Sequence, residues 1–363
     1  MPKVIVTADW HIRPGGVIWR HRARPCGDIQ FALQQIDSYI QQESPDSVWI
    51  LGDTFHASYN ASSCVDIISA IRDWPNVYFV QGQHDYSSPP WLEVLKLGRH
   101  LSGVQSIAGL RVAGIDWVVR ASDFYDFISQ LASCDVLITH QVFKEFVPGG
   151  QVSYMQIENP PFRFLFSGDF HEPRVIQHDN FTFLSPGSPA VNTIAENFQS
   201  YAWLFDGENL TSLPLKKRRI ISVAVDTKEA AEEFVANNPV ENFLDPDLPG
   251  DLIHPLLVVQ APMPVFKVIS SAYADCYVVP RRSANRDSDA EVQSADSGPV
   301  DQSLRSSFFK VFEEQFGLGN AVLDLISAAG TSGAEKDSLF RRCLERVKAN
   351  INDPRLEQFY ADH

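Results

Sequence analysis

The sequence has no uninterrupted run of about 18 apolar residues, which argues against a membrane-spanning helix. It has no C-x-x-C pair, and its 5 cysteines are an odd number spread along the chain, so neither a disulfide framework nor a cysteine metal site is expected. The strand-like run KVIVTA follows the first two residues, without the basic and apolar segments of a secretory signal. These absences predict a reduced, cytoplasmic protein.

Positive charge is scarce, because 30 Lys and Arg face 45 Asp and Glu and give a formal net charge of −15. Phosphate binding needs a basic surface, so the whole molecule does not attract nucleic acid over a long range. Any contact with DNA must therefore be local or shared with a basic partner, and bound cations would offset part of the acidic charge.

The first part of the chain, residues 1–212, alternates strand-like and helix-like segments. A helix is predicted over 28–42, where apolar residues recur every three or four positions, and another over 64–74. This alternation predicts a layered α/β domain. The expected strands are KVIVTA, the runs 47–51, 76–81, 110–119, 135–139 and 163–167, and FTFL.

Three further regions follow. Residues 213–283 are predicted to form a small α/β domain, and the polar Ser/Asp-rich segment 284–303 a flexible linker. Residues 304–363 are predicted to form a helix-loop-helix with apolar stripes on both helices. So short a segment has little core of its own, so its stripes either bind a partner or pack against the rest of the chain.

Metal-binding types of residue follow five of the predicted strands. In chain order the motifs are Asp9-x-His11, Gly52-Asp53, Gly82-Gln83-His84-Asp85, His140 and Gly168-Asp169-Phe170-His171. Each motif alone is common in a surface loop or around a core histidine. Together they predict one compact metal site, because an α/β sheet gathers its chemistry at the carboxyl ends of its strands, and Asp, His and amide oxygens bind divalent ions.

The order and strand context of these motifs, over residues 3 to about 205, resemble the calcineurin-like metallophosphoesterase superfamily. The resemblance implies a layered β-sandwich flanked by helices. Within the superfamily the chain resembles the SbcD-type DNA repair nucleases, including their phage relatives. The shared features are Gly52-Asp53-Thr54-Phe55-His56, the pair His140-Gln141, and Ser185-Pro186-Gly187-Ser188-Pro189 followed by Asn192 and Glu196.

The resemblance implies two Mn²⁺ ions, with Mg²⁺ as the alternative. It assigns Asp9, His11, Asp53 and His171 to the first ion, and Asp53, Gln83, His140 and Asp169 to the second. His84 would face the scissile phosphate, and His56 would help to place the DNA. Gln83 and Asp169 depart from the family's Asn and His. An oxygen ligand in place of a nitrogen should favour Mn²⁺ or Mg²⁺ over Zn²⁺, or else the second ion binds weakly.

The implied function is Mn²⁺-dependent 3′–5′ exonuclease and single-strand endonuclease activity on DNA ends. Residues 213–283 would be a DNA-capping domain, 304–363 would dock on an SMC-like coiled-coil ATPase, and the protein would be a homodimer. Arg13, Arg20, Arg22 and Arg24 either contact DNA phosphates or form a solvated loop. The basic run 216–219 more simply flanks the connection between two domains.

Two alternatives remain open. The same fold and metals would serve a phosphatase or cyclic-nucleotide phosphodiesterase, although the Phe55-His56 extension and the additional C-terminal regions favour a nuclease. The substitutions Gln83 and Asp169 could instead mark a catalytically weak scaffold that holds DNA ends, although most of the expected ligands are retained.

Overall fold

The computed structural model describes residues 2–13, 18–19, 22–23, 27–57, 69–147 and 149–280. The predicted linker and helix-loop-helix lie outside these residues, as do Arg20, Arg24 and the side chain of Arg22. Residues 1–284 form one compact unit.

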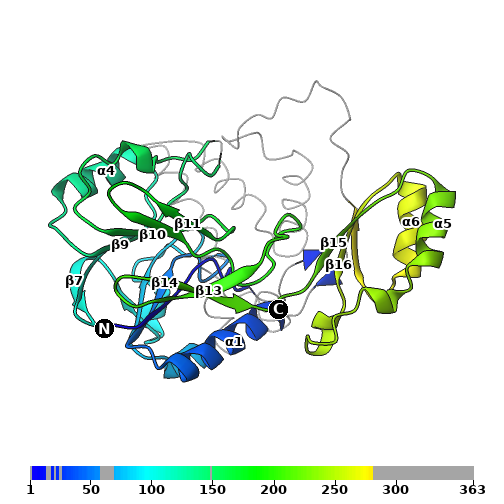
Figure 1. Cartoon of the computed structure of the whole chain (residues 1–363), viewed down its shortest axis with the longest axis horizontal. Coiled ribbons are helices and arrows are strands. Elements are labelled where there is room, and N and C mark those ends of the chain that lie inside the picture. Colours follow the sequence, from blue (N-terminus) through cyan, green and yellow to red (C-terminus); the bar gives the residue numbers. More distant parts are fainter. Residues whose placement is uncertain are drawn as a thin grey trace, which may run out of the picture. The chain divides into compact units, whose positions relative to one another are not determined.

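Two six-stranded sheets form the first part of this unit (Figure 1). The first has the order β14 (Leu210–Leu215), β13 (Ser200–Phe205), β1 (Val4–Thr7), β4 (Ser47–Leu51), β5 (Val77–Val80) and β6 (Arg99–His100). The second has the order β11 (Arg174–Gln177), β12 (Thr182–Ser185), β10 (Phe164–Gly168), β9 (Val136–His140), β8 (Leu110–Ile115) and β7 (Gly103–Ile107). Strands β1, β4 and β5 pair in parallel, and so do β8, β9, β10 and β12. The predicted α/β sandwich is confirmed.

Alternation along the strands produces the layers. Val4 and Val6 of β1 face a core shared by both sheets, whereas Ile5 faces a second core that includes the apolar side of α1 (Gly27–Glu43). On the other sheet, Phe164 and Phe166 enter the shared core, and Leu165 packs with α4 (Ala121–Gln130) in a third. Each sheet therefore has one face against the other sheet and one face against a helix.

Shorter elements complete this part. They are the hairpin β2 (Ile18–Trp19) and β3 (Arg22–Ala23), the short helix α3 (Trp91–Val94), and the 3-10 helices η2 (Ser69–Asp73) and η3 (Tyr154–Gln156). The predicted helix over 64–74 is present as η2 within its described portion, and residues 64–68 lie outside the described residues.

A small three-stranded sheet follows, with the order β15 (Ile220–Ala224), β16 (Leu256–Gln260) and β17 (Tyr277–Pro280), all parallel. Helices α5 (Lys228–Asn237) and α6 (Met263–Ala272) lie side by side and share its core (Figure 1). The Thr227 hydroxyl caps α5 by accepting from the Ala230 amide. The 3-10 helices η4 (Val240–Asn242) and η5 (Gly250–Ile253) connect α5 to β16. Among the described helices, none has both the length and the hydropathy to cross a membrane.

Candidate metal centre

The predicted ligands meet where strands of both sheets end. Asp9 and His11 follow β1, Asp53 follows β4 and Gln83 follows β5, all from the first sheet. The second sheet contributes His140 at the end of β9, and Asp169 and His171 after β10. Parallel strands place these ends at one edge of each sheet, and packing of the sheets brings the two edges together.

The first group of ligand atoms is compact. One possible ligand atom from each of Asp9, His11 and His171 lies within 4.8 Å of the others. His11 Nε2 and His171 Nε2 are 3.0 Å apart. Since each nitrogen would lie about 2.1 Å from a bound ion, two ligands of one ion must lie within about 4.2 Å of each other. The spacing therefore suits two neighbouring ligands of one ion.

Asp53 lies between the two predicted ligand sets. Its Oδ2 is 3.5 Å from His11 Nε2 and 3.4 Å from His140 Nε2. Its Oδ1 accepts a hydrogen bond from the His84 amide at 3.0 Å, which fixes the rotation of the carboxylate. Asp53 Oδ2 therefore lies between a histidine of each predicted ligand set.

The two substituted positions contact each other. Gln83 Nε2 donates to Asp169 Oδ1 at 2.7 Å, so the amide oxygen of Gln83 points away from this bond and is buried without a partner. Asp169 Oδ1 also lies 3.9 Å from His140 Nε2. The side chain of Gln83, one methylene longer than the family's Asn, therefore reaches Asp169 and holds its carboxylate in place by this hydrogen bond.

Several buried oxygen and nitrogen atoms of the candidate ligands have no hydrogen-bond partner in the described part of the chain. A buried polar atom without a partner costs free energy, which a bound cation would offset. The orphaned atoms are therefore those a divalent ion would use, and the residues fit such a group. They include Asp9 Oδ2, Asp53 Oδ2, Gln83 Oε1 and His140 Nε2.

Burial and neighbouring charges shift the pKa values of these groups in opposite directions. Burial raises the pKa of Asp9 to about 7, and lowers that of His11. Burial also opposes ionisation of Asp53, but the charge of His140, whose Nε2 lies 3.4 Å from Asp53 Oδ2, outweighs it and lowers the Asp53 pKa. Conversely, Asp53 raises the pKa of His140 despite burial. Asp9 therefore lacks a sufficient counter-charge among the side chains, which a cation would supply.

Four predicted ligands have left-handed backbones that non-glycine residues rarely adopt. The φ angles of Asp9, His11, Asp53 and Asp169 are 56°, 47°, 49° and 78°. Such strained residues concentrate at functional sites, where the surrounding structure holds them in place.

Three glycines allow the loops after β4, β5 and β10 to approach the side chains of Asp53 and His140 closely. A Cβ on Gly82 would overlap Asp53 Oδ1, and a Cβ on Gly52 or Gly168 would overlap the His140 ring. Space therefore requires glycine at positions 52, 82 and 168, and the φ of +85° requires it at position 52 as well.

The two predicted catalytic histidines lie beside the first group. The rings of His84 and His56 stack with centroids 5.2 Å apart, and the His84 ring is 4.9 Å from that of His11. His84 Nδ1 donates to the His56 carbonyl at 3.0 Å, which leaves Nε2 to meet a substrate. Ligand atoms of His11, His56 and His84 also lie within 4.8 Å of one another, so these two histidines could themselves hold an ion.

Two acidic side chains organise the centre without having been predicted as site residues. Buried Glu196 accepts from His171 Nδ1 at 2.7 Å and from the Asn192 amide at 2.6 Å. Buried Asp85 accepts from the Thr54 and Gly82 amides, at 2.7 and 2.8 Å, and so ties the loops after β4 and β5. The sequence could have indicated both residues, because Asp85 belongs to the motif Gly82-Gln83-His84-Asp85 and Glu196 to the segment that begins at Ser185.

Of the four predicted DNA-binding arginines, the structure describes the side chain of Arg13 alone. Its charge contributes, after burial, to lowering the pKa of His56, so Arg13 lies close to the site. Arg20, Arg22 and Arg24 remain predictions, because their side chains lie outside the described residues.

Comparison with known proteins agrees with the fold. Residues 2–173 match the family profile described as calcineurin-like phosphoesterase. No curated protein matches the sequence.

Similar solved structures include a novel archaeal phosphodiesterase, at 12% identity and TM-score 0.36, covering 59% of this chain and 99% of that one. Yfce, a phosphoesterase from E. coli, has 16% identity and TM-score 0.34, with 58% and 91% covered. GAP50 of Plasmodium has 12% identity and TM-score 0.40, with 60% and 89% covered. Similarities this low do not bear on function. The profile match over residues 2–173 and the two-sheet α/β architecture are both consistent with the metallophosphoesterase fold.

Proposed function

We propose that the chain is a Mn²⁺-dependent DNA nuclease of the SbcD type that trims DNA ends from 3′ to 5′ and cuts single strands. The observation that carries the proposal is the clustering of His11, His140 and Asp9 around Asp53, whose carboxylate also accepts a hydrogen bond from the His84 amide. This is the arrangement needed for phosphodiester hydrolysis at a two-metal centre.

Asp9, His11, Asp53 and His171 would hold one divalent ion, and Asp53, Gln83, His140 and Asp169 the other. Two such ions would neutralise the phosphate and supply the attacking water in nucleophilic form. The protein itself fixes the ligand directions, because Glu196 orients His171 and the Leu51 carbonyl orients His140. In its imidazolium form, His84 would keep the Nδ1 hydrogen on the His56 carbonyl and give the Nε2 proton to the departing 3′ oxygen.

The stacked pair of His56 and His84 favours a nucleic acid substrate over a small phosphomonoester. The His56 ring lies beside His11 of the first metal group and stacks on His84, where it would contact a DNA strand that enters the site. The three-stranded domain that follows the sandwich lies in the chain where SbcD-type nucleases have a DNA-capping domain.

The remaining parts of the proposal concern partners. Residues 304–363 would dock on the coiled coil of an SMC-like ATPase, two copies of the chain would form a dimer, and the complex would work in the cytoplasm of a cell or of a phage-infected host. Arg13, Arg20, Arg22 and Arg24 would contact DNA phosphates.

The test uses the full chain with Mn²⁺ and three substrates: end-labelled single-stranded DNA, duplex DNA with free ends, and a nitrophenyl phosphomonoester. We expect cleavage of DNA and loss of that cleavage in Asp53→Asn. Turnover of the monoester alone would reject the nuclease, and no turnover with two bound Mn²⁺ ions would indicate a scaffold.

A further inference from the structure

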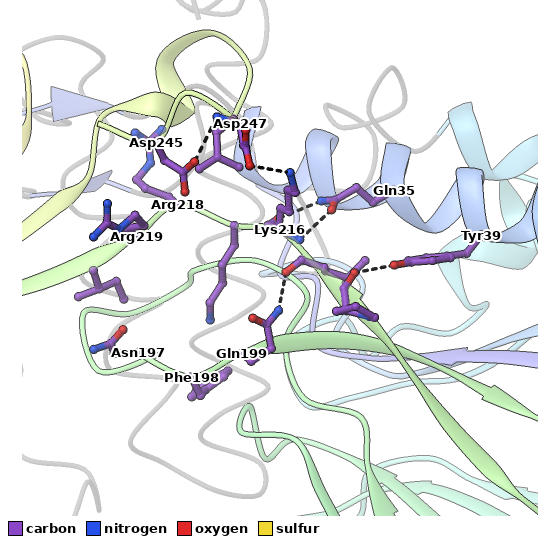
Figure 2. Close-up of a pocket in the computed structure, with 15 residues that line it drawn as sticks. Gln35, Tyr39, Asn197, Phe198, Gln199, Lys216, Arg218, Arg219, Asp245 and Asp247 are labelled. Atoms are coloured by element: carbon purple, nitrogen blue, oxygen red, sulfur yellow. Dashed lines mark hydrogen bonds and ion pairs between the residues drawn. The ribbon is translucent and has the colours of Figure 1, made fainter. Parts of the chain in front are cut away.

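A cavity of about 750 Å³ lies next to the connection between the sandwich and the three-stranded sheet (Figure 2). Its walls come from α1, the segment 197–199, the end of β14, the basic run 216–219 and the turn 245–248. None of the candidate metal ligands lines it. It is within the usual size range of small-molecule sites, about 300–1,000 Å³.

Two of the four cations in the basic run have structural roles. Lys216 pairs with Asp247 at 3.3 Å, as Figure 2 shows. Arg218 is buried and pairs with Asp28 at 3.1 Å and Asp251 at 3.0 Å. The Arg218 contacts join α1 to the loop before β16. Lys216 and Arg218 therefore serve the structural connection between the two parts.

The other two cations have no salt bridge among the described residues. Lys217 Nζ donates to the Glu196 carbonyl at 3.0 Å and lies 4.2 Å from the centre of the Phe198 ring. Arg219 makes one long contact, 3.4 Å, to the Phe243 carbonyl. Both side chains line the cavity, and each has further N–H groups to donate.

The environment of Lys217 is costly for a cation. Burial lowers its pKa to about 8, and the Glu196 carboxylate offsets this only in part. A half-buried ammonium that is incompletely hydrated and has no salt bridge among the described residues is stabilised when an external anion binds beside it. The cavity lining contains four cations, Lys216 to Arg219, and two carboxylates, Asp245 and Asp247, so it is locally basic in a chain with a net charge of −15.

We propose that this cavity binds the phosphate group of a nucleotide-sized molecule, with Lys217 and Arg219 as its charged contacts. Phosphate fits because it accepts several charge-assisted hydrogen bonds at once. The volume exceeds what a free phosphate ion would fill, and the rings of Tyr39 and Phe198 offer apolar surface to the remainder of the ligand. The phosphate could belong to a free nucleotide or to the backbone of a DNA strand.

This inference does not depend on the proposed nuclease activity, because the site can be tested without metal. The full chain is titrated by calorimetry in EDTA with thymidine monophosphate, thymidine and hexathymidylate. The variants are Lys217→Met and Arg219→Gln. Lys228→Met serves as control, because this exposed lysine pairs only with Glu232 one helical turn away among the described contacts.

We expect at least one phosphate-bearing probe to bind and thymidine to bind about tenfold more weakly or not at all. Each cavity variant should weaken phosphate binding about tenfold, and the control should leave it within twofold. Tight binding of the monophosphate identifies a nucleotide site, and tight binding of hexathymidylate alone identifies a strand site.

The proposal is overturned if neither phosphate probe binds the wild-type chain, or if the variants bind as well as it does. Arg219 is exposed, so Arg219→Gln should fold even if Lys217→Met does not. Circular dichroism of each variant separates lost binding from lost structure.

Discussion

His171 donates its Nδ1 hydrogen to the buried carboxylate of Glu196 at 2.7 Å, and this bond directs Nε2 toward His11. The interaction raises the pKa of His171 to about 9 against the opposing effect of burial. It joins a candidate ligand to a residue that lies 25 positions later in the chain. Metal-binding histidines are commonly oriented in this way, and loss of such a partner weakens the metal site.

Glu196→Gln should therefore lower Mn²⁺ affinity about 10–100-fold, because the neutral amide no longer holds the imidazole so strongly. Calorimetric titration of the metal-free chain measures this directly. Glu208→Gln, at an exposed turn, is the control and should leave affinity within twofold. Equal affinities in the two variants would mean that Glu196 does not position His171.

Gly52 and Gly109 provide a matched pair, because both have a φ of +85° and only Gly52 is crowded. Gly109→Ala should cost about 1–2 kcal/mol of unfolding free energy through backbone strain alone. Gly52→Ala should cost more and also weaken Mn²⁺ binding, since its Cβ would displace His140. Urea denaturation and metal titration check both effects, and equal costs at the two positions would contradict the crowding.

His84→Ala should reduce kcat on DNA about 10²–10⁴-fold and leave Mn²⁺ affinity within twofold, because His84 is predicted to act on the leaving oxygen and not to hold an ion. Single-turnover cleavage assays and metal titration separate the two effects. Full activity in His84→Ala would reject its role. Lost metal binding would favour the alternative in which His11, His56 and His84 share an ion.

Asp169→His should shift metal preference toward Zn²⁺, because imidazole nitrogen is a softer ligand than carboxylate oxygen. The ratio of Zn²⁺ to Mn²⁺ affinity should rise about tenfold or more, as measured by competition titration. Gln83→Asn tests the partner of Asp169, because the shorter amide side chain would no longer reach the Asp169 carboxylate. An unchanged ratio would mean that position 169 does not contact an ion.

His100 predicts a pH dependence of stability away from the metal centre. Its Nε2 bonds the Asp116 carboxylate at 2.9 Å, and this hydrogen bond raises the His100 pKa above its usual value despite partial burial. A raised folded-state pKa stabilises the fold fully below pH of about 6.5, and the contribution is lost as pH rises through the folded-state value.

His100→Gln should thus cost about 1–2 kcal/mol at low pH and less as pH rises. Urea denaturation across this pH range provides the measurement. In an Asp116→Asn background the pH dependence of that cost should disappear. A cost that does not vary with pH would show that the pair is not ionic.

The sandwich could be predicted because alternating apolar residues dictate which face of each strand is buried. Strands β1, β4, β5, β9 and β10 lie within one or two residues of their predicted positions. Helix α6 was not predicted, because Val265, Val268 and Ile269 are β-branched and suit a strand as well as a helix.

The candidate ligands could be selected from the sequence because each lies at the end of a buried strand or within four residues after it. The left-handed backbones of Asp9, His11, Asp53 and Asp169 could not, since such conformations depend on the loops around them. The hydrogen bond between Gln83 and Asp169 could not be predicted either, because two substitutions far apart in the sequence do not indicate that the two side chains are in contact.

The hydrogen bond from His140 Nδ1 to the Leu51 carbonyl, 2.6 Å long, crosses from one sheet to the other. The ring can thus adopt its ligand orientation only after the two sheets have docked. Asp53 and His140 then occupy positions that neither half of the sandwich could create alone. The candidate metal site therefore forms only in the folded sandwich, so an ion that binds there adds to the stability of the folded chain.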